Sequence, residues 1–492
     1  MKKVCILLTL LMLLSGCSKD QSHPTQPTIM TTVVTEPTGP RFVSFEVYAI
    51  NDLHGKLVDT DAQPGVDELS TYLKQSKNTI LLSTGDMWQG ASESNLTGGF
   101  MVTEWMNRLG FAAMTIGGHE FDWGEDQIRK NQELAEFPFL AINIYDRKTN
   151  TQVDYCQNSV VVDMDGAQIG IIGAIGNCYN SVSFENTKGV YFKTGPQLTE
   201  LVKAEAEKLR KNGADFIIYA IHDGYDQNTD GINAMEVDTL SYYDTALSDG
   251  YVDLVFEADS HYWYNLTDVY GVYHLQAGGN NSGISHATVM LDMYEGTSTV
   301  LTTELIPAST YYISEDDPVI AELMEKYADL IGPATKTIGT NGQYRSGKNI
   351  CQLVANLYCT KGLEKWGKDY DIVLGGGYIS CRSPGYLSTG DVTYSHLQSL
   401  LPFDNKITLC SISGRDLIDK FLETDHYAYY IKTTPYGERI RGSIEPDCTY
   451  YVVTDSYTSD YAPNNLTVID TYSADIFARD LLAEYIAAGA LS

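Results

Sequence analysis

The sequence predicts an α/β protein of two domains, in which helices cover the sheets. Segments with strand character alternate with amphipathic helical segments between Phe42 and Phe256, which is the pattern of helix-covered sheets. The chain has 492 residues, more than one hydrophobic core normally organises, so we expect a second domain. Groups of Asp, His and Gly residues follow several predicted strands, and α/β proteins bind their ligands at these strand ends.

The predicted elements follow from apolar periodicity and from residues that end helices or strands. In the first domain we expect strands at Phe42–Ile50, Thr79–Ser83, Phe111–Ile116, Phe137–Ile142, Ser159–Met164, Gln168–Ile175, Phe216–Ile221 and Val252–Phe256. Helices are expected between them at Val66–Lys74, Val102–Leu109 and Pro196–Lys211. In the second domain we expect helices at Arg345–Lys365, Gly414–Leu422 and Ala474–Ala488, the last capped by Ser473, and strands at Asp371–Leu374 and Tyr450–Thr454.

The N-terminus predicts export. Two lysines precede an apolar run from Val4 to Leu14, which is typical of a signal peptide and too short for a spanning helix. The Leu-Ser-Gly-Cys sequence at 14–17 resembles a bacterial lipobox, so we expect residues 1–16 to be removed and Cys17 to be lipidated. A flexible tether rich in Thr, Pro and Ser follows at 17–40. The predicted location is the cell surface or the periplasmic face of a bacterial membrane; a plain secretory signal is the alternative.

The composition narrows the classes of partner. The formal net charge is −31, so binding of a nucleic-acid polymer through a basic face is not expected. Acidic side chains are also the donors of divalent cation sites. Of nine cysteines, setting aside Cys5 and Cys17 leaves seven, whose spacing matches no zinc motif and permits one or two disulfides. These seven are Cys156, Cys178, Cys351, Cys359, Cys381, Cys410 and Cys448.

Histidine and carboxylate residues gather directly after the predicted strands. In the stretch from Gly117 to Asp122, His119 lies close enough to Asp122 for the carboxylate to orient the imidazole. A plain strand-to-helix turn is the alternative for this stretch alone. Four similar stretches favour a metal site, because histidines and carboxylates together bind first-row divalent metals. They are Asn51-Asp52-Leu53-His54-Gly55, Gly85-Asp86-Met87-Trp88-Gln89-Gly90, Ile221-His222-Asp223-Gly224 and Ala258-Asp259-Ser260-His261.

The second domain carries a candidate phosphate-binding segment. The predicted strand Asp371–Leu374 runs into three glycines at 375–377, and Arg382 follows shortly after. Glycines let a backbone approach an anion, and arginine can bind a phosphate through two hydrogen bonds. A glycine-rich turn with a surface arginine is the alternative. An acidic helical segment at Ser314–Leu330 is expected to connect the two domains.

Taken together, these motifs resemble the bacterial 5′-nucleotidase, 2′,3′-cyclic phosphodiesterase and UDP-sugar hydrolase family from about Phe42 to the end of the chain. Residues 51–55 match its Asn-Asp-x-His-Gly motif, and residues 85–90 match its Gly-Asp-x-x-Gln-Gly motif. The resemblance implies a two-sheet α/β/β/α metallophosphoesterase sandwich over 41–312, a connector over 313–340 and a smaller α/β C-terminal substrate domain over 341–492.

The resemblance also implies roles for individual residues. Asp52, His54 and His261 would bind a first divalent metal, while Asp86 would bridge to a second metal at His222. The mixture of histidine and carboxylate donors indicates manganese or zinc. His119 would stabilise the transition state, with Asp122 orienting it. The implied substrate-binding residues are Gly376, Gly377, Arg382, Phe403, Asn405 and Tyr457. For the ring opposite Tyr457 the sequence offers two candidates, Tyr429 and Tyr430.

The chain departs from the family pattern around the second metal. Gly118 stands where the family has an asparagine, and Asp259 stands where it has a histidine. We therefore expect one firmly bound metal and a second, weaker site to which Asp259 contributes. In the second domain, Tyr457 holds the place of the stacking aromatic, but residues 458–465 lack the family's Gly-Asp loop.

The predicted function is metal-dependent hydrolysis of a small phosphate ester by a metal-activated hydroxide. The expected substrate is a nucleotide, in a reaction of the 5′-nucleotidase or cyclic phosphodiesterase type. One alternative is a lipoprotein that binds nucleotides or phosphate esters and has weakened catalysis, which Gly118 and Asp259 favour. Another is a phosphoesterase with a different substrate, which the altered segment after Tyr457 favours.

Overall fold

The computed structural model describes residues 39–491 except 60–63, 177–181, 183, 225–250, 269, 313–314, 423–425, 431–443 and 474. The signal peptide, Cys17 and nearly all of the tether therefore lie outside the described residues. Residues Pro40–Ser492 form one compact unit. Within the described ranges, no helix has both the length and the apolar character needed to cross a membrane.

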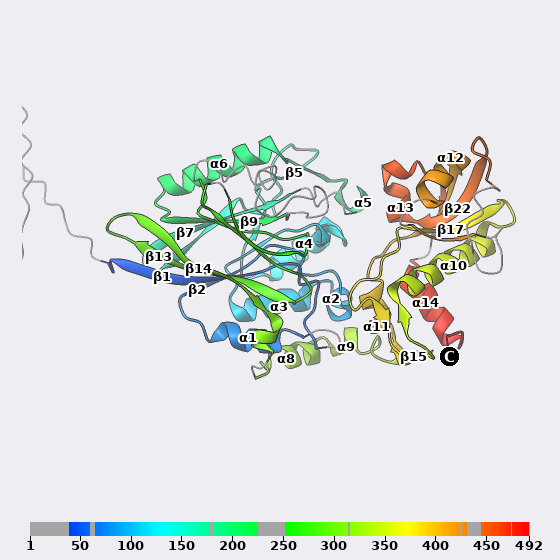
Figure 1. Cartoon of the computed structure of the whole chain (residues 1–492), viewed down its shortest axis with the longest axis horizontal. Coiled ribbons are helices and arrows are strands. Elements are labelled where there is room, and N and C mark those ends of the chain that lie inside the picture. Colours follow the sequence, from blue (N-terminus) through cyan, green and yellow to red (C-terminus); the bar gives the residue numbers. More distant parts are fainter. Residues whose placement is uncertain are drawn as a thin grey trace, which may run out of the picture. The chain divides into compact units, whose positions relative to one another are not determined.

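The first half of the chain builds two six-stranded sheets (Figure 1). The first sheet has the order β14 (Thr297–Pro307), β13 (Gly283–Asp292), β1 (Phe42–Ile50), β2 (Thr79–Ser83), β3 (Ala113–Thr115), β4 (Phe139–Leu140). The second has the order β11 (Trp263–Thr267), β12 (Tyr273–Ala277), β10 (Leu254–Phe256), β9 (Phe216–His222), β7 (Ala167–Ile175), β6 (Ser159–Met164).

Side chains that alternate along each strand separate the core into layers. In β1, Phe45 and Val47 pack between the two sheets, whereas Tyr48 faces helices α1 (Asp67–Lys74), α3 (Phe100–Leu109) and α4 (Glu125–Leu134). In β9, Ile218 packs between the sheets and Tyr219 faces helix α6 (Pro196–Lys211), which covers the second sheet (Figure 1). The predicted α/β/β/α layer order is thus confirmed.

Parallel strands bring the polar motifs to common edges of the sheets. Ile50 of β1 pairs with Ser83 of β2, and Ser83 pairs with Met114 of β3, so all three strands end together. In the second sheet, Ile175 of β7 pairs with His222 at the end of β9. The loops that follow these strands carry the predicted site residues, as expected for an α/β protein.

The second half forms a smaller α/β domain around a five-stranded sheet, as the sequence predicts. Its order is β21 (Tyr427–Tyr430), β17 (Ile372–Gly377), β22 (Thr449–Asp455), β20 (Ile407–Ser413), β23 (Thr467–Thr471). One face packs on helices α10 (Gly347–Trp366) and α14 (Ala478–Ala487). The other face packs on the short α12 (Gly414–Asp416) and the π-helix Leu417–Leu422 that continues it.

Shorter elements complete the chain. The connecting segment contains α8 (Val319–Lys326) and α9 (Ala328–Ile331), in agreement with its predicted helical character. Three two-stranded sheets pair β5 (Ile144–Asp146) with β8 (Val190–Phe192), β15 (Thr337–Asn341) with β19 (Gly390–Thr393) and β16 (Arg345–Ser346) with β18 (Tyr386–Leu387). Among the described residues, the remaining helices are α2 (Ser92–Thr97), α5 (Phe184–Thr187), α7 (Ala308–Tyr311), α11 (Tyr394–Leu400), α13 (Ser456–Asp460) and the 3-10 helices His119–Phe121 and Ala462–Asn464.

Two sequence predictions about the second domain are wrong in detail. The glycines at 375–377 lie inside β17 and not in a loop after it. A Cβ at Gly375 would collide with the backbone of helix α10, so the close packing of this strand on the helix requires glycine there. The closing helix begins at Ala478, not Ala474, so Ser473 is not its N-cap. Instead, the Asp480 carboxylate accepts a hydrogen bond from the Phe477 N–H at 2.8 Å and fixes the start there.

Candidate active site

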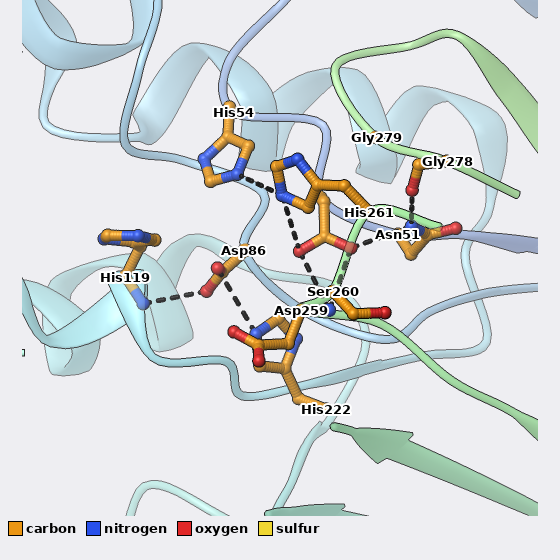
Figure 2. A network of polar contacts seen from close by, with 12 residues as sticks. Asn51, His54, Asp86, His119, His222, Asp259, Ser260, His261, Gly278 and Gly279 are labelled. Atoms are coloured by element: carbon orange, nitrogen blue, oxygen red, sulfur yellow. Dashed lines mark hydrogen bonds and ion pairs between the residues drawn. The ribbon is translucent and has the colours of Figure 1, made fainter. Parts of the chain in front are cut away.

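The predicted site residues have an unusual backbone conformation. Asp52, His54, Asp86, Asp259 and His261 all have positive φ angles, between 48° and 65°. Non-glycine residues adopt this left-handed conformation at a cost, and such strain is concentrated at functional sites. The turns after the strands therefore direct these side chains toward one place (Figure 2).

A first cluster consists of Asp52, His54 and His261. Their ligand atoms all lie within 4.8 Å of one another. The Nε2 atoms of His54 and His261 are 3.2 Å apart (Figure 2). Nε2 of His261 also lies 3.5 Å from Oδ1 of Asp52. One carboxylate and two imidazoles around a common point form a donor set for a first-row divalent metal.

A second cluster consists of Asp52, Asp86 and His222, again with ligand atoms within 4.8 Å of one another. Nε2 of His222 lies 3.3 Å from Oδ2 of Asp86 (Figure 2). Asp52 belongs to both clusters, whereas the family resemblance implies that Asp86 is the shared ligand. The two clusters are therefore adjacent, and together they offer a site for two ions.

The histidines present their lone pairs to this site. Nδ1 of His54 donates to the carbonyl of Gln89 at 2.8 Å, and Nδ1 of His222 donates to the carbonyl of Thr84 at 2.6 Å. A carbonyl can only accept, so each Nδ1 carries the proton and each Nε2 faces the cluster as an acceptor. Burial lowers the pKa of His54 well below its ordinary value, which keeps it neutral. The donor set therefore fits divalent metal ions.

Asp259 takes part in a different way from the other carboxylates. Its backbone N–H donates to the carboxylate of Asp52, at 3.0 and 3.2 Å from the two oxygens. Its own carboxylate is in neither cluster of described residues, and burial raises its pKa. The charge of His222 opposes this rise in the pKa, so the Asp259 carboxylate lies near His222, on the side expected for a ligand of the second ion. Both residues are labelled in Figure 2.

Two residues that the sequence analysis missed hold the ligand loops in place. The Glu120 carboxylate accepts hydrogen bonds from the N–H groups of Asp86 at 2.8 Å and Gly117 at 2.7 Å. The Asn51 amide donates to the Asp52 carboxylate at 2.8 Å. Both residues stand within the recognised motifs, Asn51 next to Asp52 and Glu120 next to His119. That position was the signal available in the sequence.

His119 lies at the edge of the clusters, in a 3-10 helix directly after β3. Its Nδ1 is 2.9 Å from the Asp122 carboxylate, as the sequence predicts, and its N–H donates to Asp86 at 2.8 Å. Burial lowers the pKa of His119, but Asp122 and Asp86 outweigh burial and raise it to about 9. Its ring centroid is 5.4 Å from that of His54, so His119 adjoins the proposed metal position.

The second domain contributes an arginine to the same place. Nη2 of Arg382 lies 3.2 Å from Nε2 of His119. The Arg382 guanidinium also packs on the Phe403 ring, 5.1 Å from its centroid, and that ring is 5.7 Å from the His119 ring. A guanidinium can only donate, so Nε2 of His119 is the acceptor in this contact. An anion such as phosphate placed between the two residues would instead accept from Arg382 and from a protonated His119.

A cavity of about 570 Å³ opens at this point, between residues of both domains. Six predicted residues line it, namely His119, Asp122, Arg382, Phe403, Asn405 and Tyr457. Its volume is within the usual range for small-molecule sites. Other lining residues include Gln89, Trp123, Tyr378, Ser380, Asp404, Lys406 and Asp460.

Three predicted substrate-binding residues are not among those that line the cavity. Gly376 and Gly377 pair with β21 inside the sheet. Tyr429, in β21 itself, packs against the hydrophobic core beneath α10. Their role in substrate binding stays a prediction.

The sequence analysis missed one residue that lines the cavity and one that supports a loop of its wall. Gln89 is 1% exposed, and neither atom of its side-chain amide has a hydrogen-bond partner among the described residues. It stands in the recognised Gly-Asp-x-x-Gln-Gly motif, and that was its signal. Arg479 of helix α14 donates to the carbonyls of Leu401 at 3.4 Å and Phe403 at 3.0 Å, and to the Asp404 carboxylate. It thereby holds the loop that carries Phe403, and nothing in the local sequence signalled this.

Known proteins resemble the chain in sequence and in fold, although no protein-family model matches it. The 5′-nucleotidase of Vibrio vulnificus (strain CMCP6) is 25% identical over 395 residues, which cover 72% of this chain and 69% of the relative. Endonuclease YhcR of Bacillus subtilis (strain 168) is 24% identical over 411 residues, which cover 76% of this chain but only 32% of that relative. The crystal structure of the 5′-nucleotidase precursor from Thermus thermophilus has a TM-score of 0.69 and 16% identity, covering 90% of this chain and 96% of the other.

Proposed function

Because the chain is homologous to 5′-nucleotidases and shares their fold, we propose that it is a metal-dependent hydrolase of nucleotides. One observation supports this proposal above the others. The two carboxylate–histidine clusters adjoin His119, and His119 and Arg382 lie side by side in the wall of the cavity. Hydrolysis of a phosphate ester needs both features, because the phosphoryl group must be held and its developing charge neutralised.

The side chains would divide the work as follows. Asp52, His54 and His261 would hold one divalent ion, and Asp86 and His222 a second, with Asp259 beside it. Such ions supply charge neutralisation at the phosphoryl group and lower the pKa of water.

The residues beyond the clusters would bind and polarise the substrate. His119, kept protonated by its raised pKa and oriented by Asp122, would donate a hydrogen bond to a phosphoryl oxygen as negative charge develops there. Arg382 would bind the phosphate beside it. Phe403 and Tyr457 both line the cavity and would form the walls for an aromatic base.

The mixed donors favour manganese or zinc over magnesium. Imidazole nitrogen suits first-row transition metals, whereas magnesium prefers oxygen ligands. We propose one firmly held ion at the first cluster, which has two histidines, and a weaker one at the second, which has one.

A second candidate function is binding with weakened catalysis. Gly118 and Asp259, which replace two metal ligands of the family pattern, support it. Endonuclease action, named for the relative in Bacillus subtilis, finds less support, since a net charge of −31 repels a nucleic-acid polymer.

We further propose that the protein is exported and lipidated at Cys17, on the basis of its N-terminal sequence alone. Replacing this cysteine with serine should move the protein from the membrane fraction to the soluble fraction of the cell. Equal retention of the two proteins in membranes would contradict lipidation.

The proposed activity is tested on the detergent-solubilised full chain with manganese in excess. AMP, 2′,3′-cyclic AMP, UDP-glucose and a sugar phosphate are compared by phosphate or nucleoside release, with His119→Ala as the matched control. We expect turnover of at least one nucleotide that chelation abolishes and manganese or zinc restores. Metal binding without turnover of any of these substrates would instead support the binding function.

A further inference from the structure

Two cysteines meet beside the arginine that faces the active site. Cys351 lies on α10 and is 2% exposed, whereas Cys381 is partly exposed in the segment that follows β17. They are 30 residues apart in sequence, but their Sγ atoms are 3.7 Å apart. Cys381 directly precedes Arg382.

This contact sets the pair apart from the other cysteines. Among the six cysteines that the structure describes, only these two have contacting sulfur atoms. Either thiol can donate in this contact, and the Cys381 thiol also lies 3.7 Å from the Gly347 carbonyl oxygen. A hydrogen bond from Cys381 to the Cys351 sulfur lowers the pKa of Cys351. A lowered pKa increases the thiolate fraction, and the thiolate is the form that attacks a disulfide.

We propose that Cys351 and Cys381 form a disulfide that fixes the Arg382 segment to helix α10. A disulfide needs its sulfur atoms about 2.05 Å apart, so the pair must approach by less than about 2 Å. The segment around Cys381 has no regular secondary structure and can supply this movement, whereas α10 is held by the core. A bond of this kind suits an oxidising compartment outside the cytoplasm, so its occurrence in the cell depends on the proposed export.

The bond would form by thiol–disulfide exchange with an external disulfide, such as oxidised glutathione or a disulfide oxidase. The hydrogen bond with Cys351 and burial raise the pKa of Cys381, but Cys381 is the more exposed of the two and is the sulfur that the oxidant reaches. Cys381 loses its proton and attacks one sulfur of the oxidant, which gives a mixed disulfide and releases one thiol. The Cys351 thiolate then attacks the Cys381 sulfur, forms the Cys351–Cys381 bond and releases the second thiol. The two cysteines lose two protons and two electrons in total, and the oxidant disulfide is reduced to two thiols.

The bond would act on substrate binding through Arg382. The backbone N–H of Arg382 already donates to the Leu400 carbonyl at 2.9 Å, and its guanidinium reaches His119 at 3.2 Å. A covalent link at the preceding residue removes much of the remaining freedom of this segment. A guanidinium that is ordered before the substrate arrives binds phosphate at a lower entropic cost.

The first test measures the bond itself and needs no enzymatic activity. The full chain is equilibrated with mixtures of reduced and oxidised glutathione, alkylated, digested and analysed by mass spectrometry. We expect a linked pair of peptides containing Cys351 and Cys381, whose mass falls by the two lost hydrogens relative to the reduced peptides. If both cysteines remain alkylated even in oxidised glutathione alone, while the cysteines of a secreted control protein pair, the proposal is overturned.

The second test asks whether the bond orders Arg382, and it depends on the proposed hydrolase activity. We expect the oxidised protein to have a KM about three- to tenfold lower than the reduced protein, with a similar kcat. Cys351→Ala and Cys381→Ala should both have the KM of the reduced form and no redox dependence. Cys359→Ala, a buried cysteine on the same helix, should keep the redox dependence.

These outcomes separate the two proposals. A linked peptide pair in a protein without turnover would contradict the hydrolase function alone. A linked pair with the same KM in both redox states would overturn the effect on Arg382.

Discussion

The two sides of the cavity are built by different means. On the side of the first domain, Asp52, Asp86 and His222 are at most 2% exposed and follow directly from strands of two packed sheets. On the side of the second domain, Phe403 stands in a loop without regular structure, which Arg479 holds from a helix far along the chain. The first side is thus set by the core, and the second by a few side-chain contacts.

This difference predicts different effects of mutation on the two sides. The metal clusters and His119 stabilise charge that develops in the transition state, so changing them should lower kcat. The groups of the second domain, Arg382 included, hold the substrate equally before and during reaction, so changing them should raise KM. Substitutions on each side test this division, from the largest expected effect to the smallest.

The strongest test replaces a carboxylate that belongs to the second cluster. Asp86→Asn removes the charge but keeps a residue type that tolerates the φ angle of 55° found there. We expect kcat/KM to fall on the order of 10³-fold, more than the roughly 10- to 100-fold typical of residues that only support ligands. Phosphate release and bound manganese are both measured.

The control for this substitution is Asp165→Asn, in an exposed turn with a nearly equal φ angle of 54°. It should leave both quantities unchanged. Full activity in Asp86→Asn would show that this carboxylate does not hold a catalytic ion.

His119→Ala should lower kcat about 10²-fold without loss of bound metal. The alanine removes the hydrogen-bond donor beside the phosphoryl group but leaves the clusters intact. Asp122→Asn, which only weakens the orientation of the ring, should cost about tenfold. Metal loss in His119→Ala would contradict the separation between this residue and the clusters.

The pH profile gives a second readout for His119. In the folded protein Asp122 and Asp86 raise its pKa to about 9, so the imidazolium persists below that pH and is lost as the pH rises through it. We therefore expect kcat to fall above about pH 9 in the native protein. The same alkaline fall should be absent from the residual activity of His119→Ala.

Arg479→Lys tests the other side of the cavity. Lysine keeps the charge but cannot reach two carbonyls and a carboxylate at once, so the loop that carries Phe403 should loosen. We expect KM to rise about tenfold, with kcat changed less than about twofold and the bound metal unchanged. Arg415→Lys, at an exposed position of the same domain, is the matched control. A fall in kcat as large as the rise in KM would contradict the proposed division between the two sides.

How much of the site the sequence could predict also differs between the two sides. His54, His119 and His222 follow strands whose apolar runs are visible in the sequence. Each strand and the functional side chain after it can therefore be predicted from the same stretch of sequence. Parallel pairing then brings these strand ends to common edges by a general rule of α/β folds. Few long-range contacts are needed to predict that their side chains meet.

The second domain depends on contacts between residues that are distant in sequence. Arg479 is 76 residues from Phe403, and nothing around either residue signals their hydrogen bond. The strands between Trp263 and Pro307 were also missed, because threonines and tyrosines with mixed exposure hide their alternation. The sequence also does not reveal that the glycines at 375–377 belong to a strand, because their close packing on α10 is a tertiary feature.

Tyr457 and Tyr429 allow a cavity residue to be compared with a core residue within the second domain. Tyr457 lines the cavity, whereas Tyr429 packs against the core beneath α10. Tyr457→Leu should raise KM for a nucleotide about fivefold and leave KM for a sugar phosphate unchanged, because a stacking surface is lost. Tyr429→Leu should lower thermal stability and leave both KM values unchanged. A selective loss of nucleotide binding in Tyr429→Leu would support its originally predicted role.

The smallest expected effect is a rise in metal binding and turnover when the second metal position is improved. Gly118 has φ −65° and ψ −48°, a right-handed helical conformation that asparagine adopts without strain. Gly118→Asn would restore the amide that the family pattern has beside the catalytic histidine. We expect tighter binding of the second ion and a turnover about two- to fivefold higher at limiting manganese, because a second cation adds charge stabilisation.

The gain depends on both His119 and Asp259. In the double variant Gly118→Asn with His119→Ala the gain should vanish, since the added ion cannot replace the lost hydrogen-bond donor. Asp259→His should also tighten the second ion if the carboxylate beside His222 is the weaker ligand there (Figure 2). Metal occupancy is measured by elemental analysis after graded chelation, and turnover is measured at each step. If both single variants bind and lose metal as the native protein does, the second ion is not held between His222 and residue 118, and Asp259 serves Asp52 through its backbone alone.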